Sequence, residues 1–122
     1  MRAPCLGTSE PPCSAGDAPT WNALELIDIS IEAGDNLFDT ADVYSSGECE
    51  RILGATLKGR RDDVLIATKS GQATDDGPMD GGSSRPRLIR AVDSALQRLD
   101  TDRIDLFQIH AFDGATPQEE TI

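Results

Sequence analysis

Four titratable side chains are the residues of this 122-residue chain best placed for chemistry, because each lies at or just beyond the end of a predicted strand. Asp39 ends one strand and Tyr44 follows it, Lys69 comes directly after a second strand, and His110 ends a third. Sheets and barrels of the α/β class place their chemistry at the carboxyl ends of parallel strands. A carboxylate, a phenol, an ammonium and an imidazole at one edge would be suited to acid–base chemistry.

Each of these residues alone also has an ordinary structural explanation. Asp39 could cap a turn, Tyr44 could be half-buried packing, and Lys69 could be a surface lysine. A lone histidine such as His110 is more often a buried residue bonded to the backbone than a functional one. Four such residues at the same edge favour the chemical interpretation.

Short apolar segments predict the strands that would position these side chains. Residues 36–40, 64–68 and 104–110 are the three strand candidates, and residues 4–8 form a weak fourth. The run 64–68 is apolar and β-branched throughout, which is typical of a strand covered on both faces.

Helices are predicted between the strands. One begins near Pro19 and ends at Gly34, a second covers about 48–58, and a third covers 84–99. The third has the clearest apolar stripe, formed by Leu88, Val92, Leu96 and Leu99. Residues 116–119 look like a capping box, but we expect no helix there because the chain ends three residues later.

The alternation of helix and strand predicts an α/β fold with parallel βαβ units. Residues 1–18 are rich in Pro, Ser and Gly and are predicted to be irregular, as is the segment 71–84.

Composition excludes several classes of function. The formal charge of −11 disfavours a nucleic-acid partner, and no apolar run is long enough to cross a membrane. Three cysteines without a C-x-x-C pair, and no signal-peptide pattern, favour a reducing, cytoplasmic location. Neither phosphate-binding glycine motif occurs, and the acidic residues of 75–80 lack the spacing of a calcium loop. We therefore expect no metal site.

Several segments together resemble the aldo-keto reductases. They are Phe38-Asp-Thr-Ala-Asp-Val-Tyr44, Ser46-Gly-Glu-Cys-Glu50, Ile52-Leu-Gly54, Ala67-Thr-Lys69 and the run from Leu99 to His110. The resemblance extends from about residue 19 to the end. It implies a partial (β/α)8 TIM barrel, roughly the first four β/α units with a degenerate first strand. The expected domains are an irregular segment, 1–18, and the N-terminal half of the barrel, 19–122.

The resemblance also implies an activity, the NADPH-dependent reduction of an aldehyde or ketone to an alcohol. Its catalytic tetrad falls on Asp39, Tyr44, Lys69 and His110. Tyr44 would protonate the carbonyl oxygen, assisted by Lys69 and Asp39, while His110 would orient that oxygen and stabilise its charge. Asp39, Lys69 and, more weakly, Thr8 would contact the cofactor. The family's phosphate-binding loops follow its seventh and eighth strands, which this sequence does not contain.

The main departure from the family pattern is length, because a complete barrel needs about 250 residues. We expect a fragment with impaired activity alone, which self-associates through open barrel edges. The alternatives are a non-catalytic, aldo-keto-reductase-like interaction module or an inert truncated product. Three substitutions also depart from the pattern: Asp35 for an apolar residue, Cys49 for Ser and Asp100 for Gly. Cys49 is expected to be buried and inert, and Asp100 to tolerate a left-handed backbone.

Overall fold

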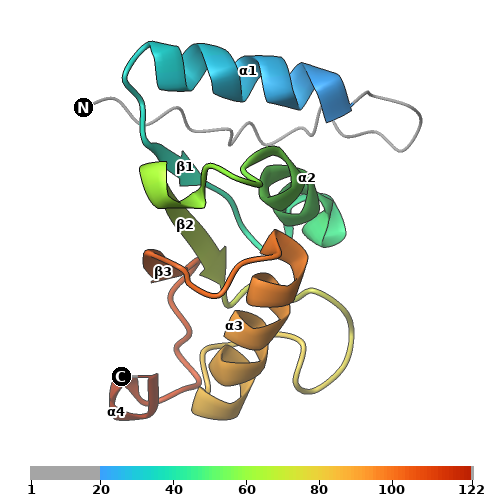
Figure 1. Ribbon diagram of the computed structural model, residues 1–122. Helices are drawn as coiled ribbons and strands as arrows, with labels where there is room; N and C mark the ends of the chain where they lie inside the picture. The colour runs from blue at the N-terminus through green and yellow to red at the C-terminus, as the bar shows by residue number, and fades with distance from the viewer. Residues whose placement is uncertain (1–19, 122) are drawn as a thin grey trace.

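Three parallel strands form the sheet of the computed structural model, which describes residues 20–121 (Figure 1). They are β1 (Leu37–Asp39), β2 (Leu65–Ser70) and β3 (Leu106–Ile109), in the order β1-β2-β3. The strand candidate at 4–8, which includes Thr8, lies outside the described residues, as do Pro19, Cys5 and Cys13. The three strands expected within the described range are confirmed.

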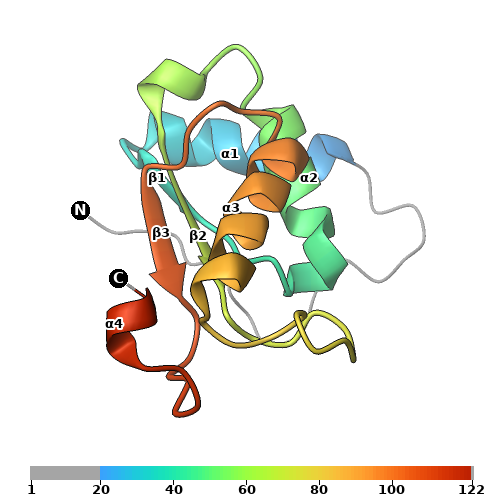
Figure 2. The ribbon, with the colours of Figure 1, turned by 90° about the horizontal axis from the view of Figure 1, so that it is seen from below.

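Helices α1 (Thr20–Glu32), α2 (Glu48–Thr56) and α3 (Arg85–Leu99) alternate with the strands. Two 3-10 turns, η1 (Tyr44–Gly47) and η2 (Arg61–Asp63), lie in the connections. Helices α2 and α3 pack against each other on one face of the sheet, and α1 packs against α2 (Figure 2). The expected βαβ pattern is therefore confirmed, and segment 71–84 is irregular as predicted.

Helix α3 begins after Ser84, whose backbone is extended, and ends at Asp100, which is left-handed with φ of +48°. The expectation that Asp100 takes the usual place of glycine is confirmed. The buried stripe differs from the predicted one, because Val92 and Leu96 are only half-buried. The fully buried apolar positions are Leu88, Ala91, Ala95 and Leu99.

The core lies between the sheet and the helices. Its buried members come from α1, α2, α3, the sheet and the segment before β2: Ile27, Phe38, Leu53, Leu57, Val64, Ile66, Ala95 and Leu99. Helices α2 and α3 meet at Gly54, where an added Cβ would lie 2.2 Å from the carbonyl oxygen of Leu99. This contact requires glycine and sets how closely the two helices pack.

Alternation along the strands gives the sheet two different faces. Ile66 and Thr68 point toward the helices, where Ile66 joins the core and Thr68 bonds to a side chain of α2. Leu65 and Leu106, on the opposite face, are 43% and 45% exposed. The prediction that the second strand is covered on both faces is therefore wrong at Leu65, because the helices described cover only one face.

Three smaller expectations also differ from the structure. A single helical turn, α4 (Gln118–Thr121), forms where no helix was expected, and the hydroxyl of Thr121 donates to the carbonyl of Ser83 at 3.0 Å. This tertiary hydrogen bond supports a turn too short to be stable alone. Cys49 is half-buried rather than buried. Asp35 is also only half-buried, so its carboxylate does not carry the cost of full burial.

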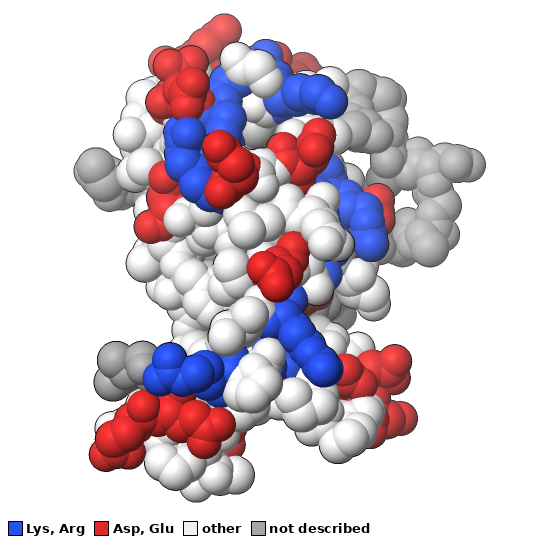
Figure 3. Space-filling view, turned by 60° about the horizontal axis from the view of Figure 1, so that its bottom comes forward, with Lys and Arg blue, Asp and Glu red and all other residues white. Residues whose placement is uncertain are grey.

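Charged side chains are unevenly distributed over the surface. One face has a broad area without them, flanked at both ends by basic and acidic groups (Figure 3). No helix within 20–121 is long and apolar enough to cross a membrane.

Candidate active site

The turn that follows β1 places Tyr44 beside the end of β2. The N–H of Thr40 donates to the carbonyl of Ala67 at 2.9 Å, and that of Asp42 donates to the carbonyl of Lys69 at 3.0 Å. The chain thus continues along β2 past the last strand residue. It then turns through Ser45 and Ser46, whose φ angles of +47° and +54° are uncommon for residues other than glycine. Such backbone strain clusters at functional sites.

Asp39 and Lys69 form an ion pair across neighbouring strands. The Lys69 ammonium also donates to the carbonyl of Thr40 at 3.1 Å. The two side chains are only 19% and 17% exposed, so water screens the pair weakly. Both residues occupy the sheet face that the helices leave open, because each alternates with a residue of that face along its strand. The ammonium is therefore held in one position at the carboxyl end of the sheet.

Tyr44 and His110 complete the group. The Lys69 ammonium lies 5.4 Å from the centre of the Tyr44 ring, within the range of a cation–π contact. The rings of Tyr44 and His110 have centroids 5.8 Å apart and meet edge to face at 88°. The backbone N–H of His110 donates a hydrogen bond of 2.8 Å to the carbonyl of Ser70, which fixes the histidine beside the end of β2. The structure thus brings together all four predicted site residues; their catalytic roles stay a prediction.

Three polar atoms at the strand ends have no hydrogen-bond partner. The hydroxyls of Thr40 and Ser70 and the Nδ1 atom of His110 are buried and make no hydrogen bond. All three belong to residues at the carboxyl ends of β1, β2 and β3. Buried polar groups are rarely left unpaired, and an unpaired one often indicates a missing water, ion or ligand. By alternation Thr40 and Ser70 share the helix-covered face with Ile66 and Thr68, so the His110 Nδ1 is the unpaired atom whose side chain also contacts the cluster.

Asp113 is a structural residue after His110 that the sequence analysis missed. Its carboxylate accepts hydrogen bonds from the Thr116 hydroxyl at 2.6 Å and from the N–H groups of Ser83 and Ala115 at 2.9 Å. These bonds, led by that from Thr116, lower the pKa of Asp113 to about 2. Asp113 thereby ties the segment after His110 to the loop before α3. An aspartate two residues before Ala115 suggests a local turn, but its bond to Ser83 could not be inferred without the fold.

Glu50 is a second residue that was missed as a site neighbour. It is fully buried in α2, where it accepts from the Thr68 hydroxyl at 2.7 Å and from the Arg98 Nε at 2.5 Å. Thr68 precedes Lys69 in β2, so Glu50 joins α2 and α3 to the strand that carries the ammonium. A buried carboxylate stays charged only with such partners.

Asp105 also joins separate elements through hydrogen bonds, but at the opposite end of the sheet. Burial would raise the pKa of Asp105, but hydrogen bonds from the Ile66 N–H and the Arg61 guanidinium outweigh burial and lower it. The Arg61 contact is 2.6 Å long, and the Ile66 contact is 2.8 Å long. This network is at the amino ends of the strands, where barrels carry structural rather than catalytic residues.

Comparison with known proteins identifies one family across most of the chain. The sequence model of the Aldo/keto reductase family matches residues 5–122. The uncharacterized oxidoreductase YqkF of Bacillus subtilis (strain 168) is 37% identical over an alignment of 131 positions, which covers 100% of this chain and 43% of YqkF. Aldo-keto reductase YhdN of the same strain is 38% identical over 108 residues, 87% of this chain and 33% of YhdN.

Two further matches extend the comparison. A probable voltage-gated potassium channel subunit beta of Oryza sativa subsp. japonica is 39% identical over 106 residues, 82% of this chain and 31% of that protein. The solved holo form of aldo-keto reductase AKR11C1 from Bacillus halodurans superimposes with a TM-score of 0.76 and 39% identity, covering 85% of this chain and 36% of that one. The chain spans less than half the length of each of these proteins. The structural match confirms the predicted fold class, an α/β partial (β/α)8 barrel.

Proposed function

Because this chain belongs to the aldo/keto reductase family, we propose that it carries the catalytic residues of an NADPH-dependent enzyme that reduces an aldehyde or ketone to an alcohol. The observation that carries the proposal is the convergence of Asp39, Tyr44, Lys69 and His110 at the carboxyl end of the sheet. That edge is where barrels of this class have their active sites.

The proposed mechanism assigns one role to each side chain. When bound, the nicotinamide supplies the hydride that adds to the carbonyl carbon. The Tyr44 hydroxyl donates its proton to the carbonyl oxygen, so that the alcohol leaves neutral and a phenolate remains. The Lys69 ammonium beside the ring stabilises that phenolate, and Asp39 holds the ammonium in place. An N–H of His110 donates a hydrogen bond to the carbonyl oxygen as negative charge develops there.

The cofactor would bind against the open face of the sheet at its carboxyl end. Asp39 and Lys69 are the described residues that we expect it to contact. The buried Nδ1 atom of His110, which has no hydrogen-bond partner, lies at the same end of the sheet and fits a polar ligand. Thr8, a weaker candidate, is outside the described residues.

Tyr44→Phe is the decisive variant, because it removes the proposed proton donor and keeps the ring. We expect turnover of an aldehyde panel, followed by loss of NADPH absorbance, to fall by about 100-fold or more. Binding of NADPH, followed by fluorescence, should be unchanged. Equal turnover by both proteins would contradict the proposed role of Tyr44.

A non-catalytic interaction module is the second candidate. The observation that favours it is the similarity to the rice protein named as a probable potassium channel subunit beta. This candidate predicts binding of cofactor without turnover of any member of the panel. Neither binding nor turnover would instead favour an inert product.

We also propose a cytoplasmic location and the absence of a nucleic-acid partner. The net charge of −11 supports the second point, because such a chain is repelled by phosphate backbones.

A further inference from the structure

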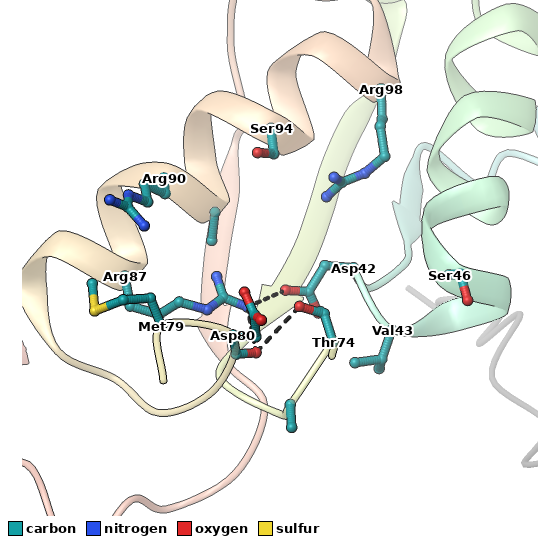
Figure 4. Close-up of a pocket in the computed structure, with 12 residues that line it drawn as sticks. Asp42, Val43, Ser46, Thr74, Met79, Asp80, Arg87, Arg90, Ser94 and Arg98 are labelled. Carbon is teal, nitrogen blue, oxygen red and sulfur yellow. Dashed lines mark hydrogen bonds and ion pairs between the residues drawn. The ribbon is translucent and has the colours of Figure 1, made fainter. Parts of the chain in front are cut away.

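A polar cavity of about 460 Å³ lies beside the tetrad, and none of the four tetrad residues lines it. It is enclosed by α3, the turn after β1 and the loop 71–84, as Figure 4 shows. Its polar lining includes Asp42, Thr74, Arg87, Arg90, Ser94 and Arg98. The volume is within the usual range of small-molecule sites.

Helix α3 supplies three guanidinium groups to this cavity. Arg87, Arg90 and Arg98 are separated by three and eight residues, a spacing that brings them to one side of a helix. Against them the lining holds two carboxylates, Asp42 and Asp80. Glu50 pairs with Arg98 from behind the lining, so the three guanidinium groups are balanced by three carboxylates, and what distinguishes the arginines is how each is bonded.

Arg87 is the buried member of this group, and the protein leaves part of its hydrogen-bonding capacity unused. Its side chain is 7% exposed and crosses the cavity toward Asp42 (Figure 4). One terminal nitrogen makes two long contacts, 3.3 Å to Asp42 and 3.4 Å to the carbonyl of Asp80. Its Nε and the Asp42 Oδ1 are both buried without a hydrogen-bond partner. A buried charge with such incomplete bonding is costly unless a further group completes it.

The other two arginines differ in whether a carboxylate pairs with them. Arg98 is committed to Glu50 through its Nε. Arg90 is exposed and forms no ion pair with any residue between 20 and 121. It is therefore the charged group of the cavity that is free to meet a ligand.

We propose that this cavity binds a small oxyanion, the phosphate or carboxylate group of a metabolite, against Arg87 and Arg90. Guanidinium groups bind both kinds of group through paired, charge-assisted hydrogen bonds. The hydroxyl of Ser94 adds a neutral donor at the wall, whereas that of Thr74 donates to the carbonyl of Asp80 at 3.2 Å. The site is separate from the proposed catalytic cluster but joined to it, because the Asp42 N–H bonds to the carbonyl of Lys69 at 3.0 Å.

The test is a titration of the 122-residue chain with inorganic pyrophosphate and, separately, with malonate, at ionic strength held constant with NaCl. The Nε–H signals of the arginines in ¹H–¹⁵N spectra report binding at this cavity. We expect saturable shifts with at least one anion. Arg90→Gln should weaken binding about tenfold and Ser94→Ala about threefold. Arg51→Gln removes an exposed arginine of α2 that does not line the cavity, and it should leave binding unchanged.

The outcomes separate the alternatives. Saturation by pyrophosphate alone or by malonate alone supports the site and assigns its ligand to phosphates or carboxylates. Shifts that NaCl alone reproduces would overturn the proposal, as would equal affinities for Arg90→Gln and Arg51→Gln, which indicate a diffuse charge effect. No step of this test measures turnover, so its failure leaves the proposed reduction unaffected.

Discussion

Lys69 is the residue on which the proposed chemistry depends most directly. It contacts Asp39, the Thr40 carbonyl and the face of Tyr44 while remaining largely buried. Its charge neutralises the half-buried carboxylate of Asp39 and, in the proposed mechanism, would also stabilise a phenolate.

Replacing Lys69 with Met should therefore affect both turnover and stability. We expect turnover to fall by about 100-fold or more, because the phenolate loses its counter-charge. We also expect the free energy of unfolding in urea to fall by about 3 kcal/mol, because Asp39 is left unpaired.

Lys58→Met is the matched control, because Lys58 and Asp100 are 79% and 74% exposed and 3.5 Å apart. An exposed pair of this kind contributes less than about 1 kcal/mol, so both properties should change little. Equal effects of the two variants would contradict the role given to Lys69.

The lowered pKa of Asp113 predicts that the stability of the fold depends on pH in the acidic range. Its pKa is about 2 in the folded protein and 3.8 in the reference state, so folding favours the ionised form. The stability that Asp113 contributes is present above pH 3.8 and is lost as the pH falls toward 2. Asp113→Asn should be less stable than the parent at pH 6, and the difference should shrink as the pH is lowered through this range. Urea unfolding at several pH values measures it, and a constant difference would contradict the assignment.

At the scale of elements, the packing of α2 against α3 depends on Gly54. The atom that a Cβ would meet, the carbonyl oxygen of Leu99, is backbone and cannot rotate away. Gly54→Ala should therefore push the helices apart and destabilise the protein by about 1–3 kcal/mol or more in thermal or urea unfolding.

Gly114→Ala provides the comparison for this prediction. A Cβ there would lie 3.6 Å from a ring carbon of Phe112, which is ordinary contact, and the backbone φ is not in the left-handed region. We expect a change within about 0.5 kcal/mol. A similar small change for Gly54→Ala would show that the two helices adjust freely.

The elements themselves could largely be predicted from sequence, because their signals are local. Gly34 ends α1 with φ of +93°, and Asp100 ends α3, as expected. Which residues of α3 are buried could not be predicted as well, since alanines 91 and 95 carry no strong apolar signal and their burial depends on neighbouring elements.

The residues of the candidate site also differ in whether local sequence signals could identify them. Asp39, Tyr44, Lys69 and His110 could be selected because strand ends and a family resemblance point to them. Arg87 pairs with Asp42 across 45 positions of sequence, and Asp113 bonds to Ser83 across 30. No spacing rule links residues so distant, and only the fold places them together.

For the whole molecule, β3 is one of the two edge strands of the described sheet. Its exposed Leu106 and unpaired backbone groups favour pairing with another chain. Leu106→Lys should reduce self-association at high protein concentration, measured by sedimentation. Leu26→Lys changes an equally apolar side chain of α1 that is 55% exposed, and it should have no such effect. A parent chain that stays monomeric at every concentration would contradict the expectation of association.

The alternation of side chains along β2 has a consequence for how this sequence tolerates change. Lys69 reaches the open side of the sheet because it lies four positions, an even number, after Leu65. Deleting Ala67 or Thr68 would force one of two costs: the amine turns toward the hydrocarbon interior, or the start of the strand flips and exposes Ile66 to solvent. Insertions and deletions in this strand are thus restricted more severely than substitutions, because strand length alone decides on which side the ammonium emerges.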